Sequence, residues 1–278
     1  MVEALARRKA TTDLVVRAAV YRDGSRELLE QLGADEVVVG DLTLPADATA
    51  AFAGVDAAYC IAPNMHPAEV ELGRNFVAAA QTQGCSHLVY HSVLHPQTED
   101  MPHHWRKLRV EELLFTSGLT TTILQPAAYL QNLLASWPRL VDAGVLTVPY
   151  AADTRIALVD LLDVAEVAAR VLTEPGHEHA TYELSGPESP AQLEVAEVLG
   201  RVLGRPVRVE TVPRSVWRQQ ALGRGLSDDA ADTLLRMFEY YERFEFRGNS
   251  NVLRWLLGRP PTGLESFARR TLDKHQGS

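Results

Sequence analysis

The chain has 278 residues, enough for one large domain or for a domain with a smaller lobe. Its hydrophobic content of 46%, charged content of 23% and net charge of −9 fit a soluble globular protein and argue against a nucleic-acid-coating surface. No apolar run approaches the roughly 20 residues of a membrane helix, and the first residues lack the apolar run of a signal peptide, so we expect none. We therefore expect a cytoplasmic, bacterial protein with Cys60 and Cys85 as reduced core residues.

Apolar runs alternate with helix-like segments through the first half of the chain. Strands separated by helices of this length form βαβ units and a parallel sheet. The runs are almost continuously apolar, as expected when helices cover both faces of the sheet. The pattern predicts an α/β, Rossmann-type doubly wound fold. The expected strands are 14–21, 36–39, 57–62, 87–92 and 120–124, and the expected helices are 25–32, 45–52, 67–83 and 105–117.

The pattern loosens after residue 125, and the chain becomes mainly helical after residue 186. We expect a Rossmann-like domain over 1–185 and a smaller lobe over 186–278 that contacts a substrate or a partner. The elements expected here are helices 129–142 and 163–172 and strands 155–159, 180–185 and 207–212.

The turn that normally binds a dinucleotide is missing from the sequence. Such a domain seats pyrophosphate on its first helix, through a G-x-G-x-x-G or G-x-x-G-x-x-G turn. No such spacing occurs in the sequence. Residues 1–9 resemble the last turns of that first helix. We therefore expect a domain that is truncated at its N-terminus and lacks its first strand. Three explanations stay open: a gene start placed too late, which we favour, a natural absence, or direct pairing of strands 14–21 and 57–62. We expect weakened dinucleotide binding.

Five segments carry a family pattern: RAAVYRD at 17–23, VVGDL at 38–42, SGLTTTILQPAAYLQN at 117–132, RIALVDLLDVAEVA at 155–168 and NVLRWLLGRPP at 251–261. In this order and spacing they resemble the NmrA-like group of atypical short-chain dehydrogenases/reductases. The resemblance covers nearly the whole chain. It implies an NAD(P)-binding Rossmann domain and one of two activities. Some members reduce small electrophiles or quinones, and others sense dinucleotide redox state and regulate partners without turnover.

The resemblance implies cofactor-binding residues at the ends of the predicted strands. Arg22 follows the first predicted strand, where an arginine reads a 2′-phosphate, so NADP(H) is preferred over NAD(H). Asp41, with Leu42 beside it, resembles the acid on the adenine side. Ala62 and Pro63 would line the nicotinamide-side phosphate and ribose. The alternatives are a solvated arginine, a turn-capping aspartate and a simple start of a loop.

Ser92, His103 and Lys107 decide whether the family chemistry is present. Typical short-chain reductases use Ser, Tyr and Lys, with the Tyr four residues before the Lys. The Tyr donates a proton, and the Lys lowers the pKa of that Tyr and holds the nicotinamide ribose. Lys107 takes the ribose position, or is an ordinary surface lysine, but His103 stands where the Tyr is expected. His103 could serve as the acid or be a polar residue at the helix start.

Tyr129 and Asn132 follow the proline turn at the carboxyl edge of the sheet. The resemblance makes them substrate-pocket residues, and the alternative is interior packing. Asp160 and Asp163 flank a helix start, so we expect capping roles. The spacing of the histidines fits no zinc signature, and we expect no metal site. The histidines considered are His91, His95, His103 and His104.

We therefore expect an NADP(H)-dependent reductase of a small carbonyl or quinone-type acceptor. Hydride would come from the nicotinamide, with Lys107 on the ribose and Ser92 near the reacting group. The missing Tyr favours an alternative, a dinucleotide-sensing regulator without turnover. The missing glycine-rich turn favours a second alternative, a non-binding remnant. The expected partners are a small-molecule substrate and a protein partner or second copy, without direct nucleic-acid or membrane binding.

Overall fold

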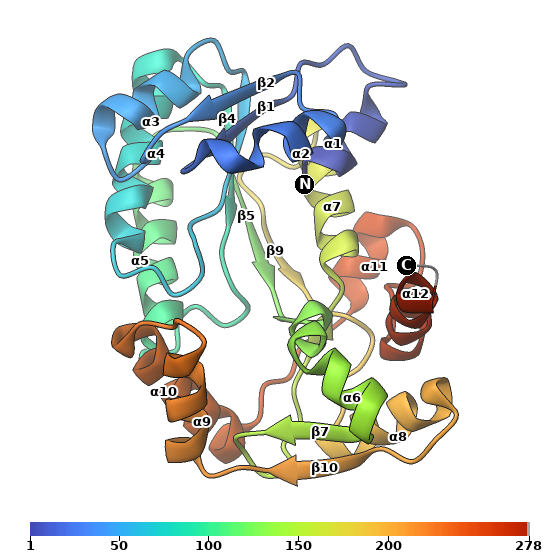
Figure 1. Cartoon of the computed structure of the whole chain (residues 1–278). Helices are drawn as coiled ribbons and strands as arrows, with labels where there is room; N and C mark the ends of the chain where they lie inside the picture. The colour runs from blue at the N-terminus through green and yellow to red at the C-terminus, as the bar shows by residue number, and fades with distance from the viewer. Residues whose placement is uncertain (277–278) are drawn as a thin grey trace. The chain divides into compact units, whose positions relative to one another are not determined.

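The structure, a computed structural model, describes residues 1–276 (Figure 1). It has the expected α/β architecture of parallel strands flanked by helices. The chain forms two compact units, and both are built from separated segments. The first unit consists of 1–92, 106–124 and 165–182, and the second of 93–105, 125–164 and the described residues from 183 onward. The described part of the predicted lobe 186–278 thus lies in the second unit, which also takes up part of the predicted Rossmann-like domain.

The first unit holds two sheets rather than one. A two-stranded sheet pairs β1 with β2, and a four-stranded sheet has the order β3-β4-β5-β9. Strands β1 and β2 are parallel, as are β3, β4 and β5, so the predicted parallel pairing is confirmed. The strands are β1 Arg17–Val20, β2 Glu36–Val39, β3 Ala57–Cys60, β4 His87–His91, β5 Thr121–Pro126 and β9 Thr181–Leu184.

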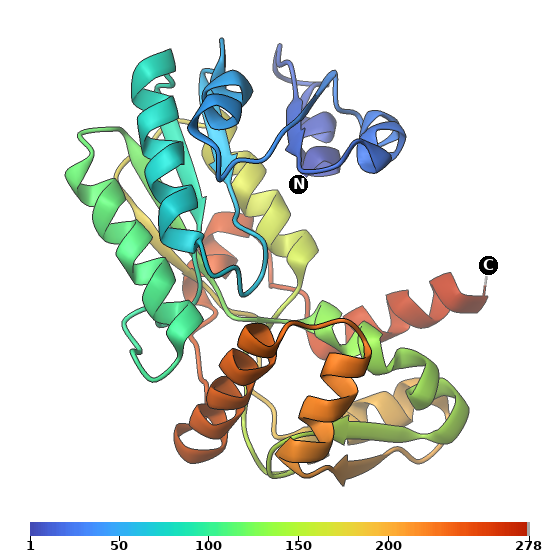
Figure 2. The same ribbon diagram turned by 60° about the vertical axis from the view of Figure 1, so that its left-hand side comes forward.

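One face of the four-stranded sheet packs on three helices, α3 (Pro45–Phe52), α4 (Glu69–Gln83) and α5 (Pro102–Thr116). Their apolar sides bury a core with Phe52, Phe76, Leu88 and Leu114 among its members. Helices α4 and α5 lie side by side (Figure 1, Figure 2). A Cβ on Gly73 would lie 2.7 Å from Val110 Cγ1, so close contact between these helices requires glycine there.

Residues 1–9 are helical, as predicted. Helix α1 (Val2–Arg8) has no fully buried residue. It is fixed by Lys9, whose ammonium donates to the Gly33 carbonyl over 2.8 Å. Gly33 has φ +100°, and an added Cβ there would lie 2.5 Å from Ala6 Cβ, so only glycine fits. The first unit also contains η1 (Asp23–Ser25) and α2 (Arg26–Gln31). Helix α7 (Leu161–Thr173) begins in the second unit and continues into the first.

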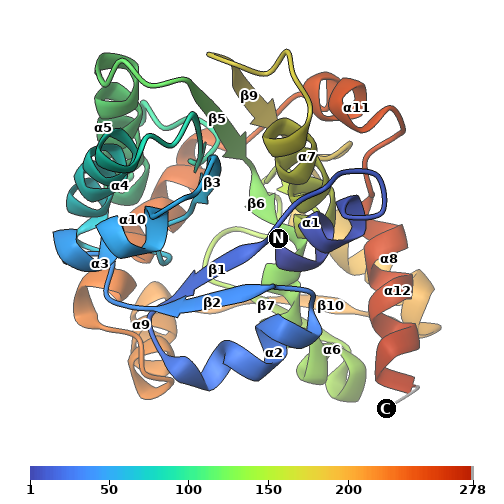
Figure 3. The same ribbon diagram turned by 90° about the horizontal axis from the view of Figure 1, so that it is seen from above.

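Strands β1 and β3 do not pair with each other, so the direct-pairing explanation is wrong (Figure 3). The carbonyls of Val16 and Val20 accept hydrogen bonds from the β2 chain. Backbone groups of a strand alternate between its two edges, so those of Arg17 and Ala19 point to the opposite edge. Among the described residues no strand pairs with that edge of β1.

Strand β3 has a matching open edge. The Asp56 carbonyl accepts from the β4 chain, so the backbone groups of Ala57 point away from β4. Large apolar side chains near the open edges are exposed: Val15 is 69%, Tyr21 64% and Ile61 53% accessible. Inner strands of a doubly wound sheet are normally paired and covered, because unpaired edges leave hydrogen-bonding groups without partners.

The second unit is mainly helical, with two short parallel strand pairs, β7–β10 and β6–β8. Its core includes Trp137, Leu140, Leu199 and Phe267. The strands are β6 Ala128–Tyr129, β7 Val145–Val148, β8 Leu158–Val159 and β10 Arg208–Thr211. The helices are η2 Leu130–Ser136, α6 Trp137–Ala143, α8 Gln192–Leu203, α9 Arg214–Gly223, α10 Asp228–Phe244, α11 Asn251–Leu257 and α12 Leu264–Gln276.

Two sequence predictions in this unit need correction. The expected helix 129–142 is a short strand followed by the 3₁₀ segment η2 and then α6, which ends at Gly144 with φ 62°. Strand β7 was not predicted, because a four-residue apolar run gives little periodicity.

The capping role of Asp160 is confirmed: its Oδ1 accepts from the Leu162 N–H over 3.0 Å. None of the helices in the described part of the chain has the length and apolar character to cross a membrane.

Candidate functional site

In the first unit, polar side chains cluster at the carboxyl end of β4. In α/β sheets, ligands bind outside the carboxyl ends of the strands. Loops 21–25, 40–44 and 61–68 follow β1, β2 and β3, and they contain the predicted cofactor-binding residues. Lys107 and Ser92 belong to the same unit. The structure therefore keeps all predicted cofactor residues in one compact unit.

Lys107 lies on α5 with its side chain only 13% accessible. Its ammonium donates to Glu69 Oε1 over 2.8 Å and to the carbonyl oxygen of His91 over 3.2 Å. The ammonium also lies 5.3 Å from the centre of the Tyr90 ring. An ammonium has three hydrogens, and the third has no acceptor among the described residues. One N–H of Lys107 is thus available to a bound molecule.

Glu69 is the partner that sequence reasoning missed. It begins α4 directly after the β3–α4 loop, and its side chain is 2% accessible. The same oxygen that binds Lys107 also accepts a hydrogen bond of 2.7 Å from the Tyr90 hydroxyl. Burial and the neighbouring Glu69 charge raise the pKa of Tyr90 well above its usual value, so this hydroxyl stays a donor. The available sequence signal for Glu69 was its place as an acidic residue in the first turn of a helix. Compensation of the helix dipole explains an acidic residue there equally well.

Ser92 also faces a buried carboxylate. Its hydroxyl donates to Oε1 of Glu111, which lies one helical turn beyond Lys107 on α5. Its backbone N–H donates to the Leu124 carbonyl over 2.8 Å. Ser92 and Lys107 are therefore brought to the same end of β4. Each is held by a glutamate that the sequence analysis did not single out.

His91 and Tyr59 form a second polar pair in this unit. The Tyr59 hydroxyl and the Nδ1 atom of His91 share a short hydrogen bond. Burial, with a smaller contribution from the Lys107 charge, lowers the pKa of His91 to about 3. His91 is therefore neutral at physiological pH. The histidine–tyrosine pair was not anticipated, because 32 residues separate its members.

Arg22 lies in the loop after β1 and is exposed. Its guanidinium is 5.6 Å from the centre of the Tyr21 ring, and it forms no ion pair within the described residues. Arg17, the other arginine near this loop, is occupied by Glu36 at 2.6 Å and by the Ala53 carbonyl at 2.5 Å. Of Arg17 in β1 and Arg22 in the loop that follows it, Arg22 is therefore the one that is open to an anionic ligand.

Asp41 and Leu42 form the turn after β2. The Asp41 carboxylate accepts from the Thr43 N–H over 3.0 Å and from the Thr43 hydroxyl over 2.6 Å. These hydrogen bonds lower the pKa of Asp41. The Leu42 carbonyl accepts from the buried Asn75 side chain over 3.0 Å. Asp41 thus has the turn-stabilising role that was its alternative interpretation, and its second oxygen is still free to accept.

The remaining predicted residues differ in exposure. Ala62 is buried in the core, whereas Pro63 is exposed in the β3–α4 loop. Tyr129 is half-buried in β6, and Asn132 is exposed in η2, both in the second unit. His103 is buried in the first turn of α5, and its ring lies 4.4 Å from that of His104. No group of metal-binding side chains occurs in the part of the chain that the structure describes.

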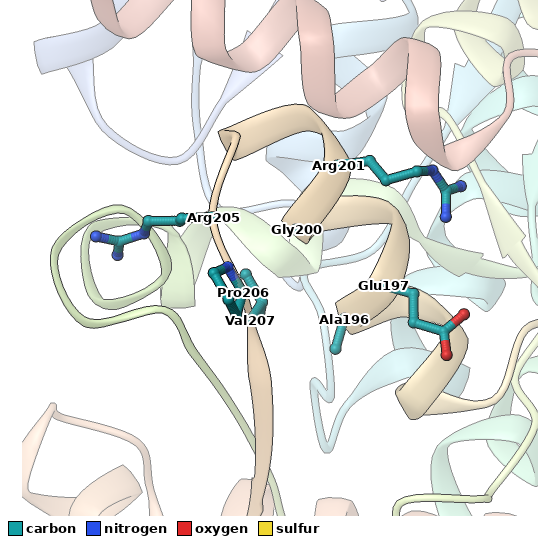
Figure 4. Close-up of a pocket in the computed structure, with 7 residues that line it drawn as sticks. All are labelled: Ala196, Glu197, Gly200, Arg201, Arg205, Pro206 and Val207. Carbon is teal, nitrogen blue, oxygen red and sulfur yellow. The ribbon is translucent and has the colours of Figure 1, made fainter.

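The second unit has an open surface pocket of about 470 Å³ beside α8 (Figure 4). Its charged side chains extend away from Pro206 and Val207, and none of the predicted site residues lines it. The lining residues are Ala196, Glu197, Gly200, Arg201, Arg205, Pro206 and Val207.

The chain matches the model of the NmrA-like family over residues 1–271. It belongs to the NmrA-like family. The NAD(P)H azoreductase of Xenophilus azovorans is 27% identical over 252 residues, which cover 90% of this chain and 87% of that protein. Quinone oxidoreductase 2 of Escherichia coli is 30% identical over 216 residues, or 78% of this chain and 75% of that protein.

A solved structure of the NADPH-dependent quinone oxidoreductase of Escherichia coli, in complex with NADPH, has the same fold as this NmrA-like chain. The TM-score is 0.84 at 26% identity, over 97% of this chain and 95% of the other. The expected family and the Rossmann-type architecture are therefore confirmed. The names of the two sequence relatives, an NAD(P)H azoreductase and a quinone oxidoreductase, give two different acceptor types.

The residues of this NmrA-like chain fit one part of a dinucleotide. Arg22 is exposed and unpaired by acids, which suits a 2′-phosphate. Lys107 has one uncommitted N–H at the end of β4, which suits a ribose hydroxyl. Among the described residues no strand is followed by a glycine-rich turn that would supply backbone N–H groups for the two bridging phosphates.

Proposed function

We propose that this NmrA-like chain is an NADP(H)-dependent reductase of a small carbonyl or quinone-type acceptor. The observation that carries the proposal is the largely buried Lys107, held at the end of β4 with one N–H uncommitted. Similarity to an azoreductase and to a quinone oxidoreductase, over most of each chain, supports the same reaction class.

In this proposal the nicotinamide cofactor supplies the hydride when it is bound. Lys107 donates its remaining N–H to a ribose hydroxyl and places a positive charge near the reacting centre. Arg22 pairs with the 2′-phosphate. The oxygen of Ser92 keeps acceptor capacity while its hydrogen is directed to Glu111. Asp41 and Leu42 contribute on the adenine side.

The remaining proposed contacts involve less specific groups. Ala62 and Pro63 contribute backbone at the start of the β3–α4 loop. Tyr129 and Asn132 remain the proposed acceptor-binding residues, and His103 takes the role of the acid only if His103→Phe loses most of the activity. We expect weak dinucleotide affinity, because the phosphates have no glycine-rich turn to bind them.

The proposal is tested by following NADPH oxidation with a panel of quinones, aldehydes and azo compounds. Wild type is compared with Lys107→Ala and with an exposed arginine variant on the same helix, Arg109→Ala. The reductase proposal expects turnover with one acceptor class that is lost in Lys107→Ala and retained in Arg109→Ala. Absence of turnover with all acceptors, at saturating NADPH, would contradict it.

A second candidate function is a dinucleotide-sensing regulator without turnover. The observation that favours it is His103, a buried histidine at the position where short-chain reductases have their tyrosine acid. This candidate expects NADP(H) to bind and to shift the melting temperature, while no acceptor is reduced. Binding without turnover would therefore select the regulator over the reductase.

A further inference from the structure

The ion pair between Lys107 and Glu69 differs from its neighbours in burial. On the same two helices, Arg74–Glu71 and Arg109–Glu112 are exposed, with side-chain accessibilities of at least 52%. Lys107 and Glu69 are 13% and 2% accessible. Burying both charges carries a desolvation cost that an apolar pair of similar volume would avoid. Stability alone therefore does not account for this pair.

The geometry gives Glu69 control over the direction of the ammonium group. One carboxylate oxygen holds Lys107 Nζ at 2.8 Å and is itself fixed by the Tyr90 hydroxyl at 2.7 Å. The His91 carbonyl takes a second N–H of the lysine. With two hydrogens fixed, the direction of the third is set by the protein rather than by solvent.

Glu69 also joins two parts of the site. It is the first residue of α4 and ends the loop that begins after β3. Its backbone N–H donates to the His66 carbonyl within that loop. Its carboxylate reaches Lys107 on α5, a residue 38 positions further along the chain. The conformation of the β3–α4 loop and the orientation of Lys107 therefore depend on one side chain.

We propose that Glu69 is the positioning residue of the site: it holds the Lys107 ammonium against the end of β4 and leaves one N–H directed to a bound ribose. The ribose part of this statement depends on the reductase function proposed above. The positioning part concerns the protein alone and has its own test.

The test uses the scarcity of lysine in this chain, which has only Lys9, Lys107 and Lys274. A limiting amount of an acetylating reagent labels amines, and mass spectrometry of the peptides gives the rate for each lysine. In wild type we expect Lys107 to react at least about tenfold more slowly than the exposed Lys274, since one hydrogen bond between charged groups corresponds to about a 10- to 150-fold effect.

Glu69→Gln should raise the labelling rate of Lys107 by about tenfold or more, because the amine loses its charged hydrogen-bond partner and becomes accessible to the reagent. Lys9 and Lys274 should be unchanged. The matched control is Glu71→Gln on the same helix, which removes an exposed glutamate and should change none of the three rates. Should Glu69→Gln fail to fold, Glu69→Asp replaces it, and the shorter carboxylate should still raise Lys107 labelling severalfold.

Two results would overturn the positioning role: wild-type Lys107 reacting as fast as Lys274, or Lys107 labelling that stays at the wild-type rate in the folded Glu69 variant.

Kinetics then test the proposed contact between Lys107 and the ribose. Glu69→Gln should raise KM for NADPH, and it should have no further effect in a Lys107→Ala background. A protected Lys107 in a protein that oxidises no NADPH would retain the positioning role and reject the reductase proposal. Independent effects of the two variants on KM would reject the ribose contact.

Discussion

Lys107 donates a hydrogen bond of 3.2 Å to the carbonyl oxygen of His91, the last residue of β4. The contact joins helix α5 to the end of a buried strand. It fixes a positive charge at the edge where α/β sheets bind ligands. It also brings that charge close to the His91 ring, whose neutral form it favours. The following predictions start from this pair and its surroundings.

His91 should make the protein sensitive to acid. Its pKa is lowered to about 3 in the folded state, from an unfolded value of 6.5. Below pH 6.5 the unfolded chain binds a proton that the folded chain does not. The free energy of unfolding should therefore fall by up to about 1.4 kcal/mol per pH unit between about pH 6 and pH 3, with no effect of this group above pH 7.

The measurement compares urea unfolding of wild type and His91→Gln at several pH values. The variant loses the Tyr59 contact in part and should be less stable at pH 7, but its stability should fall less steeply in acid. Parallel pH dependences for the two proteins would show that His91 is not the responsible group.

Lys107 should matter more for activity than His103. Lys107→Ala removes a largely buried cation at the end of β4 and should lower kcat/KM strongly, whereas His103→Phe should have a weak effect. General acid catalysis contributes typically about 10²- to 10⁴-fold. A loss of that size in His103→Phe, with a wild-type rate that falls as pH rises through about 6.5, would make His103 the substitute acid.

Arg22 should select NADPH over NADH. A guanidinium paired with a 2′-phosphate forms charge-assisted hydrogen bonds of about 1.5–3 kcal/mol, or roughly a 10- to 150-fold preference. Arg22→Ala should remove most of it, as measured by calorimetry with both cofactors. The control is Arg26→Ala, whose guanidinium pairs with Asp23 at 2.7 Å. An unchanged affinity ratio in Arg22→Ala would assign the 2′-phosphate contact to a residue other than Arg22.

Dinucleotide binding by the 278-residue chain should be weak. Backbone N–H groups at a glycine-rich turn normally bind the pyrophosphate, and no such turn is present. Calorimetric titration with NADPH should give a dissociation constant above the micromolar range. Sub-micromolar binding would mean that another part of the chain holds the phosphates.

The open edges of β1 and β3 predict that an added strand stabilises the first unit. A fused segment of roughly 15–20 residues before Met1, encoding an apolar strand, a glycine-rich turn and the start of a helix, could pair with both edges. We expect the melting temperature to rise by about 5 °C and NADPH binding to tighten. A glycine- and serine-rich segment of the same length is the control. Equal melting temperatures for the two fusions would contradict the prediction.

The local sequence determined the elements of the first unit. The helix over residues 1–9, strand 36–39 and helix 45–52 follow from apolar periodicity and from the proline that starts the last of them. The same local reading placed Lys107 on a helix after a buried strand and found no glycine-rich turn. These features depend on residues close together in the chain, where periodicity and turn chemistry act directly.

Tertiary structure alone decided the partners of the predicted site residues. Glu69 and Lys107 are 38 residues apart, and no sequence pattern links an acid at the start of one helix to a lysine on the next. Their contact depends on how closely α4 and α5 pack, which glycine at position 73 permits. The pairing of β7 with β10 and the open edges of β1 and β3 likewise depend on which strands meet in space. Long-range packing on a shared sheet determines these contacts, so they have no local signal in the sequence.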